Sequence, residues 1–320
     1  MKGIILSISK ALFLFFLLLP LTAFSQYAHV DEIVRTYPKS FSGTQGLADK
    51  INADFSEDDD KARAIFTWIA LNISYDMSEF NSKNTIAYSF STPEEKIRKE
   101  LEFRAAIVKK TLRSGKAVCE GYASLFTNLC TLTGLESVIV PGTSRNHHSQ
   151  IGKLPTARDH AWNVVKINGQ WKLIDVTWAA GIVNSDGFQQ IFNDAYFLTA
   201  PNRFFLNHYP DDPKWMFTNK SASEFASQAF YYPTYLKSNY KFNIEDGVIR
   251  LKKDLPLEFN VENLRSTDKV YYITSRDKVL DEVNVDENNN FLIFPSPKMS
   301  GYLTIFINQK PVVSYKIVKS

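Results

Sequence analysis

The chain has 320 residues, of which 44% are hydrophobic, 14% aromatic and 22% charged. This composition is typical of a globular protein with a large core, and it excludes a disordered chain or a collagen-like fibre. The formal net charge is only +3, from 37 basic and 34 acidic residues. Nucleic acid is therefore not expected as a partner, because such binding depends on clustered basic residues that neutralise phosphate. The length favours two domains.

Residues 1–25 have the pattern of a secretory signal peptide. Lys2 and Lys10 accompany the start of an apolar run, and Ala23 and Ser25 place small side chains where a cleavage site requires them. The run is shorter than the roughly 20 residues of a membrane-spanning helix. An uncleaved N-terminal anchor is the alternative. We expect an extracytoplasmic protein, periplasmic or secreted, with no integral membrane domain after cleavage.

Two helices are expected in the next part of the chain. Ser56 and Asp59 form a capping-box-like start for a helix that runs to about Asn72. The acidic run 58–60 is better explained as charge that favours a helix N-terminus than as a calcium loop. A second helix is expected over 92–112, because a threonine cap is followed by proline at the first helical position.

The sequence contains only two cysteines, Cys119 and Cys130, and both fall in one predicted helix over 119–133 that ends at Gly134. A helix of that length separates their Cα atoms by about 16 Å, whereas a disulfide requires about 7 Å or less. The two cysteines are therefore not expected to pair. Cys130 lies among apolar residues and is expected to be buried. Cys119 lies at the first turn, where free backbone N–H groups and the helix dipole stabilise a thiolate.

A strand over 135–140 is expected to end at Pro141 and Gly142, and a long polar loop follows it. This loop directly precedes the next strand and is placed to frame a substrate. It contains His147 and His148, but the sequence lacks the HExxH or CxxC spacing of a metal site. We therefore interpret the two histidines as solvated residues, and no metal is expected.

The segment HAWNVVKINGQWKLIDVTW predicts a β-hairpin, because Asn168-Gly169 between two β-prone runs is typical of a type I′ turn. In this register His160 lies opposite Thr177 and is a diagonal neighbour of Asp175 on the same face. Diagonal neighbours lie roughly 7 to 8 Å apart at Cα, a distance that an imidazole and a carboxylate can close with a hydrogen bond.

A thiol at a helix start, an imidazole and a carboxylate that orients the imidazole are the groups that cysteine acyl transfer requires. Each also has a structural explanation, since a histidine at a strand start, an aspartate near a strand end and a cysteine at a helix start are often inert. Spacing alone does not bring Cys119 to the hairpin.

Three blocks, DDKARAIFTWIALNISYD, KAVCEGYASLF and DHAWNVVKINGQWKLIDVTW, resemble the transglutaminase-like superfamily, which has a papain-like fold, and are most similar to its kyphoscoliosis peptidase branch. The later stretch AYFLTAPNRFFLNHYPDDPKW resembles the same branch. Together they cover about 55–216. The resemblance implies an α+β fold in which a Cys-bearing helix packs on an antiparallel sheet. It implies that Cys119 is the nucleophile, His160 the base and Asp175 the third member of a triad.

Other parts of such a site are less defined by the sequence. Backbone N–H groups at the helix start, including that of Cys119, are expected to bind the oxyanion, and no second donor is identified. Tyr122, Trp162 and Trp178 are candidates for the wall of the site, with core packing as the alternative for each.

After residue 240 the pattern changes to short β-prone runs separated by turns, which predicts a small β-sandwich without a titratable constellation. The runs are FNI, GVIRL, LEFNV, KVYYITS, VLDEVNV, FLIFP, YLTIFIN and VVSYKIV. The expected organisation is a signal peptide over 1–25, a transglutaminase-like domain over 26–216, a connecting segment over 217–239 and the sandwich over 240–320. The connecting segment is either interdomain packing or an arm.

These observations predict an exported cysteine enzyme that acts on peptide or isopeptide carbonyls, most simply a peptidase or amidase. The substrate is expected to be a protein or peptide, with cell-wall peptide as one candidate, and the chemistry requires no cofactor. One alternative is a protein-crosslinking transglutaminase, in which an amine captures the acyl-enzyme. The other is a catalytically idle transglutaminase-like module that binds protein or cell-wall partners.

Overall fold

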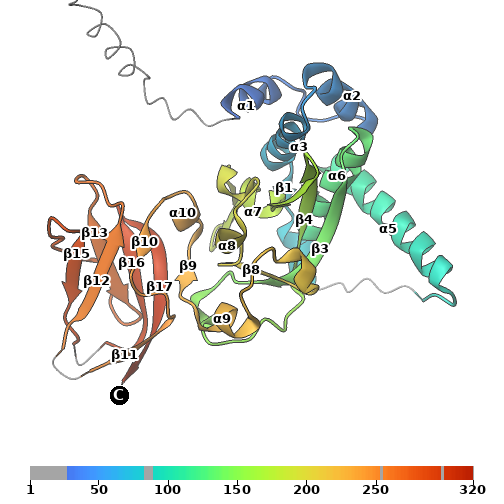
Figure 1. The fold of residues 1–320 in the computed structure, drawn as a ribbon. Helices are drawn as coiled ribbons and strands as arrows, with labels where there is room; N and C mark the ends of the chain where they lie inside the picture. The colour runs from blue at the N-terminus through green and yellow to red at the C-terminus, as the bar shows by residue number, and fades with distance from the viewer. Residues whose placement is uncertain (1–26, 83–88, 253–254, 297–298, 320) are drawn as a thin grey trace, which may run out of the picture.

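The computed structural model describes residues 27–82, 89–252, 255–296 and 299–319 (Figure 1). The predicted signal peptide lies outside these residues. Within them, no helix combines the length and the hydropathy of a membrane-spanning segment. A mixed helical and sheet part is followed by a strand-rich part (Figure 1), which agrees with the fold class expected from the sequence.

Helices form most of the chain before the first long strand. They are α1 (Ala28–Arg35), α2 (Thr44–Asp54), α3 (Asp58–Asn72), α4 (Met77–Ser82), α5 (Pro93–Ser114) and α6 (Cys119–Leu132). Helices α3 and α6 lie at the centre of the core, since residues 62–70 of α3 and 121–126 of α6 are buried. The buried Arg63 of α3 is paired with Asp31 of α1 at 2.6 Å, which fixes α1 on α3.

The helix ends agree with the sequence-based expectation for α5 and α6 and differ from it for α3. Helix α6 begins at Cys119 and is followed by Gly134 with φ +86°, and α5 is capped by Thr92, whose hydroxyl accepts the Glu95 N–H. Both agree with expectation. The capping box predicted at Ser56 was wrong: Glu57 is the N-cap of α3 and makes no side-chain cap, while the Ser56 hydroxyl donates to Glu57. The acidic first turn of α3 is present.

A four-stranded antiparallel sheet in the order β5-β4-β3-β8 carries α6 on one face. Its strands are β3 (Ser137–Ser144), β4 (His160–Ile167), β5 (Gln170–Ile174) and β8 (His208–Pro210). The amide of Asn163 in β4 donates to the Ala123 carbonyl at 3.1 Å, which ties the sheet to α6. A parallel pair of short strands, β1 (Ser74–Tyr75) and β2 (Lys116–Ala117), holds the chain just before α6.

The predicted hairpin is present in the predicted register, with Ile167 opposite Gln170 and positive φ at both turn residues. The register does not extend as far as expected. Strand β5 ends at Ile174, and Asp175 is the N-cap of a short helix, α7 (Val176–Ala180). Thr177 is therefore in a helix and not opposite His160, because the carboxylate of Asp175 accepts the Trp178 N–H and begins the helix.

The strand expected to end at Pro141 and Gly142 instead continues through both as β3. The carbonyl of Pro141 points toward β8, and the nitrogen of the same residue faces that side too. Strand pairing with β8 begins only at Gly142, so no N–H is required at position 141 and proline is tolerated there. A side chain at Gly142 would contact the Tyr209 carbonyl and lie 2.5 Å from the Trp162 ring. This close approach explains the glycine.

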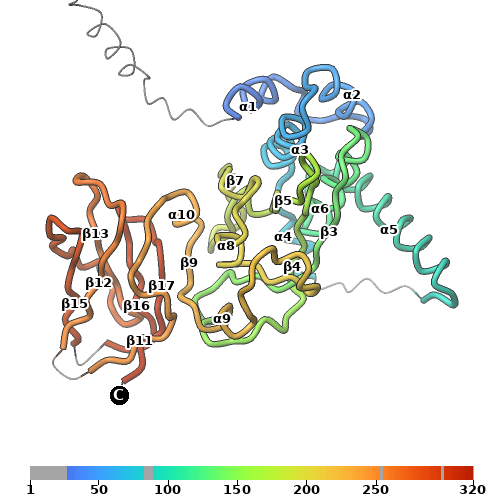
Figure 2. The backbone as a smooth tube through the Cα atoms, in the orientation of Figure 1, coloured from blue at the N-terminus to red at the C-terminus, as the bar shows by residue number. Residues whose placement is uncertain are grey.

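Short elements lie between the strands of the sheet and between the sheet and the strand-rich part (Figure 2). They are η1 (His148–Gln150), β6 (Gly181–Asn184), β7 (Gly187–Gln190), η2 (Asp194–Tyr196), α8 (Pro201–Phe204), η3 (Pro213–Trp215), α9 (Ala222–Ser227), β9 (Phe230–Tyr231) and α10 (Pro233–Leu236). The buried Arg145 donates to the backbone carbonyls of Phe225, Gln228 and Ala229. Strand β9 pairs with β17, so this connecting segment packs against both parts of the molecule.

The strand-rich part is a sandwich of two sheets, with orders β10-β12-β15 and β11-β17-β16-β13-β14. Its strands are β10 (Lys241–Phe242), β11 (Val248–Leu251), β12 (Leu257–Glu262), β13 (Val270–Thr274), β14 (Asp281–Val283), β15 (Asn290–Ile293), β16 (Gly301–Ile307) and β17 (Lys310–Lys319). Each β-prone run of the sequence forms a strand. The Phe259 ring stacks on Phe291 at 5.2 Å and contacts Tyr315 of the other sheet at 5.6 Å, which joins the two sheets. The domain boundaries remain predictions.

Candidate active site

Cys119 is the first residue of α6 and is partly exposed. Val118 before it has extended backbone, so the first N–H groups of the helix are unpaired by the helix itself. Cys130 is fully buried, and burial raises the pKa of its thiol. The two free cysteines therefore differ as the sequence predicted: one lies at an accessible helix start and the other in the core.

His160 begins β4 and Asp175 caps α7, and the two side chains meet. His160 Nε2 lies 2.7 Å from Asp175 Oδ2. The carboxylate is fully buried, and its Oδ1 accepts the Trp178 N–H at 3.0 Å. The diagonal contact inferred from the hairpin register is therefore present, although the aspartate reaches it from a helix cap instead of from a strand.

The Cys119 thiol completes this group. It lies beside His160 and raises the pKa of the imidazole, and since His160 Nε2 is bonded to Asp175, Nδ1 is the ring nitrogen left to face the thiol. The structure thus brings together the three residues that the sequence singled out, from α6, β4 and the start of α7. The contact between α6 and the hairpin is the step that spacing alone did not supply.

Electrostatics favours charge separation between the thiol and the imidazole. Burial by itself lowers the pKa of His160, but the charge and hydrogen bond of Asp175, together with Cys119, outweigh burial and raise this pKa to about 10. Burial alone would raise the pKa of Asp175, but the two neighbouring imidazoles hold it well below its usual range. At neutral pH the carboxylate is charged and favours an imidazolium beside Cys119.

A second histidine, His208 of β8, also lies on Asp175 and was not among the residues chosen from the sequence. Its Nε2 is 2.9 Å from Asp175 Oδ2, and its side chain is fully buried. The one signal for it was its place in the stretch AYFLTAPNRFFLNHYPDDPKW, which carried part of the family resemblance without assigning a role to the histidine.

Tyr75 of β1 is a further residue that the sequence did not single out. It pairs with Ala117, two residues before Cys119. The pKa of its phenol is raised, first by burial and then by the charges of Cys119 and Asp175. The Tyr75 ring contacts those of Phe80 and Phe188 at 5.8 and 6.2 Å. Tyr75 therefore lies near Cys119 and Asp175.

The three candidate wall residues lie in different surroundings. The rings of Trp162 and Trp178 lie 6.0 and 5.6 Å from that of His160, so both flank the imidazole. Tyr122 is fully buried, and its hydroxyl donates to the Ile73 carbonyl at 2.6 Å. Tyr122 therefore belongs to the core beneath the cluster and lines no exposed face.

One group of potential metal ligands lies among the described residues. His160, Asp175 and His208 have ligand atoms within 4.8 Å of one another. Their atoms are already in direct hydrogen-bond contact at 2.7 and 2.9 Å, and these contacts use the nitrogens that would bind an ion. The arrangement fits a hydrogen-bonded network better than a metal site. The rings of His147 and His148 lie 4.1 Å apart in a tilted arrangement, and His148 contacts Tyr302 of the sandwich.

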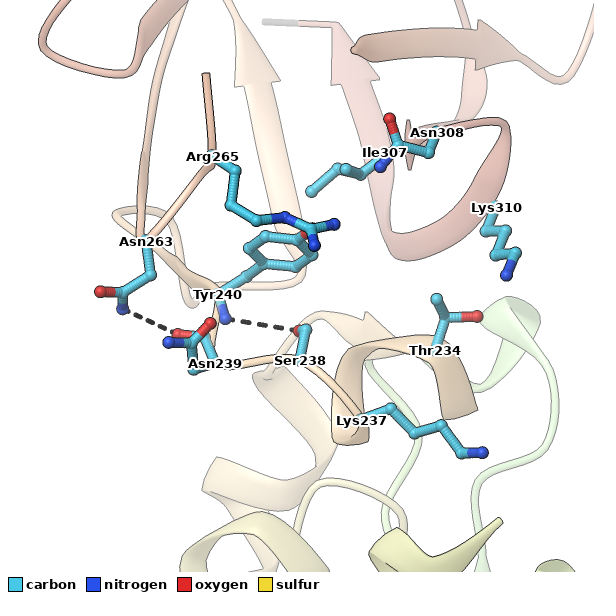
Figure 3. Close-up of a pocket in the computed structure, with 10 residues that line it drawn as sticks. All are labelled: Thr234, Lys237, Ser238, Asn239, Tyr240, Asn263, Arg265, Ile307, Asn308 and Lys310. Carbon is cyan, nitrogen blue, oxygen red and sulfur yellow. Dashed lines mark hydrogen bonds between the residues drawn. The ribbon is translucent and has the colours of Figure 1, made fainter. Parts of the chain in front are cut away.

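A separate cavity of about 600 Å³ lies between the connecting segment and the sandwich (Figure 3). Lys237, Arg265 and Lys310 are among its lining residues. Arg265 is paired with Asp268, and Lys237 donates to the Phe192 carbonyl. None of the residues that line this cavity belongs to the Cys119 cluster.

Comparison with known proteins shows which protein family this chain resembles. Residues 45–176 match the family model of the Transglutaminase-like superfamily. Within the superfamily, the chain is similar to kyphoscoliosis peptidase of Mus musculus and Homo sapiens, with 33% identity over 177 residues, covering 54% of this chain and 24% of each relative. The resemblance inferred from the three sequence blocks is confirmed.

The chain is also similar to a second curated protein and to a solved structure. Hillarin of Drosophila melanogaster is 29% identical over 172 residues, which cover 49% of this chain and 19% of hillarin. A crystal structure of a TGase shares 16% identity with a TM-score of 0.29, covering 54% of this chain and 37% of that chain. The chain spans about a quarter of the length of the kyphoscoliosis peptidases and less of hillarin.

The raised pKa of His160 leads to a prediction about thiol reactivity. Because the imidazole stays protonated up to about pH 10, it places a positive charge beside Cys119. Iodoacetamide at about pH 6 is expected to modify Cys119 rapidly and Cys130 hardly at all. His160→Ala is expected to slow the modification of Cys119 at least about tenfold.

Peptide mass spectrometry of the two cysteine-containing peptides measures both rates in one sample, with Cys130 as the internal control. Equal and slow labelling of both cysteines in the wild-type protein would contradict the thiolate–imidazolium pair.

Proposed function

We propose that this chain is an exported cysteine enzyme that acts on peptide or isopeptide carbonyls and hydrolyses them as a peptidase or amidase. The observation that carries the proposal is the 2.7 Å hydrogen bond between His160 and Asp175 beside a cysteine at a helix start. The name of the kyphoscoliosis peptidases supports hydrolysis over other acyl transfers. The substrate would be a protein or peptide, with cell-wall peptide as one candidate.

The proposed reaction begins with attack of the Cys119 thiolate on the carbonyl carbon, which forms the C–S bond. His160 then gives the Nδ1 proton to the leaving nitrogen as the C–N bond breaks, and the amine departs. Water attacks the thioester after giving a proton to His160, and the C–S bond breaks to release the acid and restore the thiolate. Asp175 holds the ring so that Nδ1 faces the reacting atoms throughout.

The oxyanion of the tetrahedral intermediate would lie at the start of α6, where the backbone N–H of Cys119 donates to it. The phenol of Tyr75 would be the second donor. It comes from the strand that pairs with the residues before Cys119. Its raised pKa keeps the hydroxyl proton available for donation at neutral pH.

Tyr75→Phe tests the second donor, since it removes the hydroxyl and keeps the ring. We expect kcat to fall by about 10- to 1,000-fold, the range typical of the loss of one oxyanion donor. Alkylation of Cys119 at about pH 6 is expected to be unchanged, because that reaction forms no oxyanion. Steady-state kinetics together with alkylation measures both quantities. An unchanged kcat in Tyr75→Phe would remove this residue from the mechanism.

Hydrolysis itself is tested with peptide and isopeptide substrates in the presence and absence of a primary amine. Cys119→Ala is expected to lower the rate at least about a thousandfold, whereas Cys130→Ala, the control at the buried cysteine, keeps it. Preferential transfer of the acyl group to the amine would instead favour a crosslinking transglutaminase. A reactive Cys119 that turns over none of these substrates would favour the idle binding module.

Export is the remaining part of the proposal, and the apolar run in residues 1–25 supports it. The protein recovered from a host with a secretion pathway is expected outside the cytoplasm, with Gln26 as its first residue. N-terminal peptide mass spectrometry reads that end directly. A chain that keeps Met1 and stays in the cytoplasm would contradict export.

A further inference from the structure

The Asp175 carboxylate serves two imidazoles, whereas the proposed mechanism uses one. Its Oδ2 accepts from His160 Nε2 at 2.7 Å and from His208 Nε2 at 2.9 Å, and its Oδ1 accepts from the Trp178 N–H. An ionised carboxylate only accepts hydrogen bonds, so both imidazoles present an N–H to the same oxygen. His208 is therefore a buried titratable group whose role the proposed reaction leaves open.

His208 is held as a neutral donor. Burial lowers its pKa, and this effect exceeds the opposing influence of Asp175. Its Nδ1 is buried and makes no hydrogen bond of regular geometry. The ring stacks on Phe204 at 4.0 Å and contacts Trp178 and Trp162 at 4.7 and 5.1 Å. Enclosed in this way, His208 has no path to a substrate, so it does not act as a second base.

We propose that His208 is a positioning residue that shares the Asp175 carboxylate with His160 and thereby limits how tightly His160 holds its proton. The inference rests on the proposed function, because it gives His208 a role through the proposed base. Two donors on one oxygen divide its negative charge between them. Each hydrogen bond is therefore weaker than the one that a single donor would make. A His160 that holds its proton less tightly is the better acid for the leaving amine.

Other titratable groups face this network from the elements packed around it. Tyr75 of β1, Tyr122 of α6 and Tyr196 of η2 all have raised phenol pKa values, for which burial is the first cause, and they stay neutral at physiological pH. Two nearby carboxylates have partners of opposite charge: Glu79 is paired with Lys110 at 2.8 Å, and Glu120 with Arg104 at 2.9 Å. These neighbours therefore add no unpaired charge to the network of His160, Asp175 and His208.

His208→Phe tests the proposal, because it removes the donor and keeps an aromatic ring in the enclosure. The readout is the rate of Cys119 alkylation, measured from about pH 5 to about pH 11, in which the upper step reports loss of the His160 proton. In His208→Phe the upper step is expected to move to higher pH by about half a unit to one unit, since Asp175 then acts on His160 alone.

Two matched variants separate donation from packing. His208→Gln places an amide N–H near Oδ2 and is expected to return the upper step toward its wild-type position. Phe204→Leu removes the ring that stacks on His208 and keeps both donors, so its upper step is expected to stay at the wild-type pH. A His208→Phe profile identical to the wild-type profile, or an equal shift in Phe204→Leu, would overturn the positioning role.

Histidine ¹⁵N NMR of the wild-type protein provides a measurement that depends on no variant folding. His208 is expected as the neutral Nε2–H tautomer across the neutral range, and a His208 that gains a proton there would overturn the inference. Failure of the inference differs from failure of the proposed function. A wild-type protein without reactive Cys119 would refute the enzyme, whereas a reactive Cys119 with an unshifted His208→Phe profile would refute only the role of His208.

Discussion

The buried carboxylate of Asp175 is the group on which the candidate site depends. A charged carboxylate without solvent is costly unless hydrogen bonds compensate it, and here three donors meet it, from β4, β8 and the first turn of α7. In the sheet order β5-β4-β3-β8, β5 and β8 are the two edge strands, so Asp175, which follows β5, and His208 of β8 meet through their side chains. The charge of Asp175 in turn keeps the imidazole of His160 protonated and oriented toward Cys119.

The other side of the site is held by backbone pairing. The short parallel ladder between β1 and β2 fixes the residues before Cys119, and it carries Tyr75 to the same place. Helix α6 is packed between α3 and the sheet, so its first turn cannot move away from β4 without opening the core. The reactive groups thus lie on rigid elements, which is the arrangement that preorganised acyl-transfer sites require.

Much of the fold and part of the site followed from the sequence. The hairpin at Asn168-Gly169, the end of α6 at Gly134, the cap at Thr92 and the strands of the sandwich all formed as expected. Two errors lay at strand ends, where a helix cap or a neighbouring strand changed the course of the chain. The Asp175 carboxylate began a helix where a continuing strand was expected, and β3 passed through Pro141 because β8 leaves that nitrogen without a partner.

The sequence by itself determined the turn, the helix ends, the separation of the two cysteines along one helix and the pairing of His160 with Asp175. Each of these depends on residues within a few positions of one another or on a register set by a tight turn. Only the tertiary structure decided that Cys119 meets His160, that Tyr75 lies near Cys119, and that His208 shares the carboxylate. Those contacts join segments that are dozens of residues apart, and their geometry depends on the packing of helices on a sheet, which no local pattern encodes.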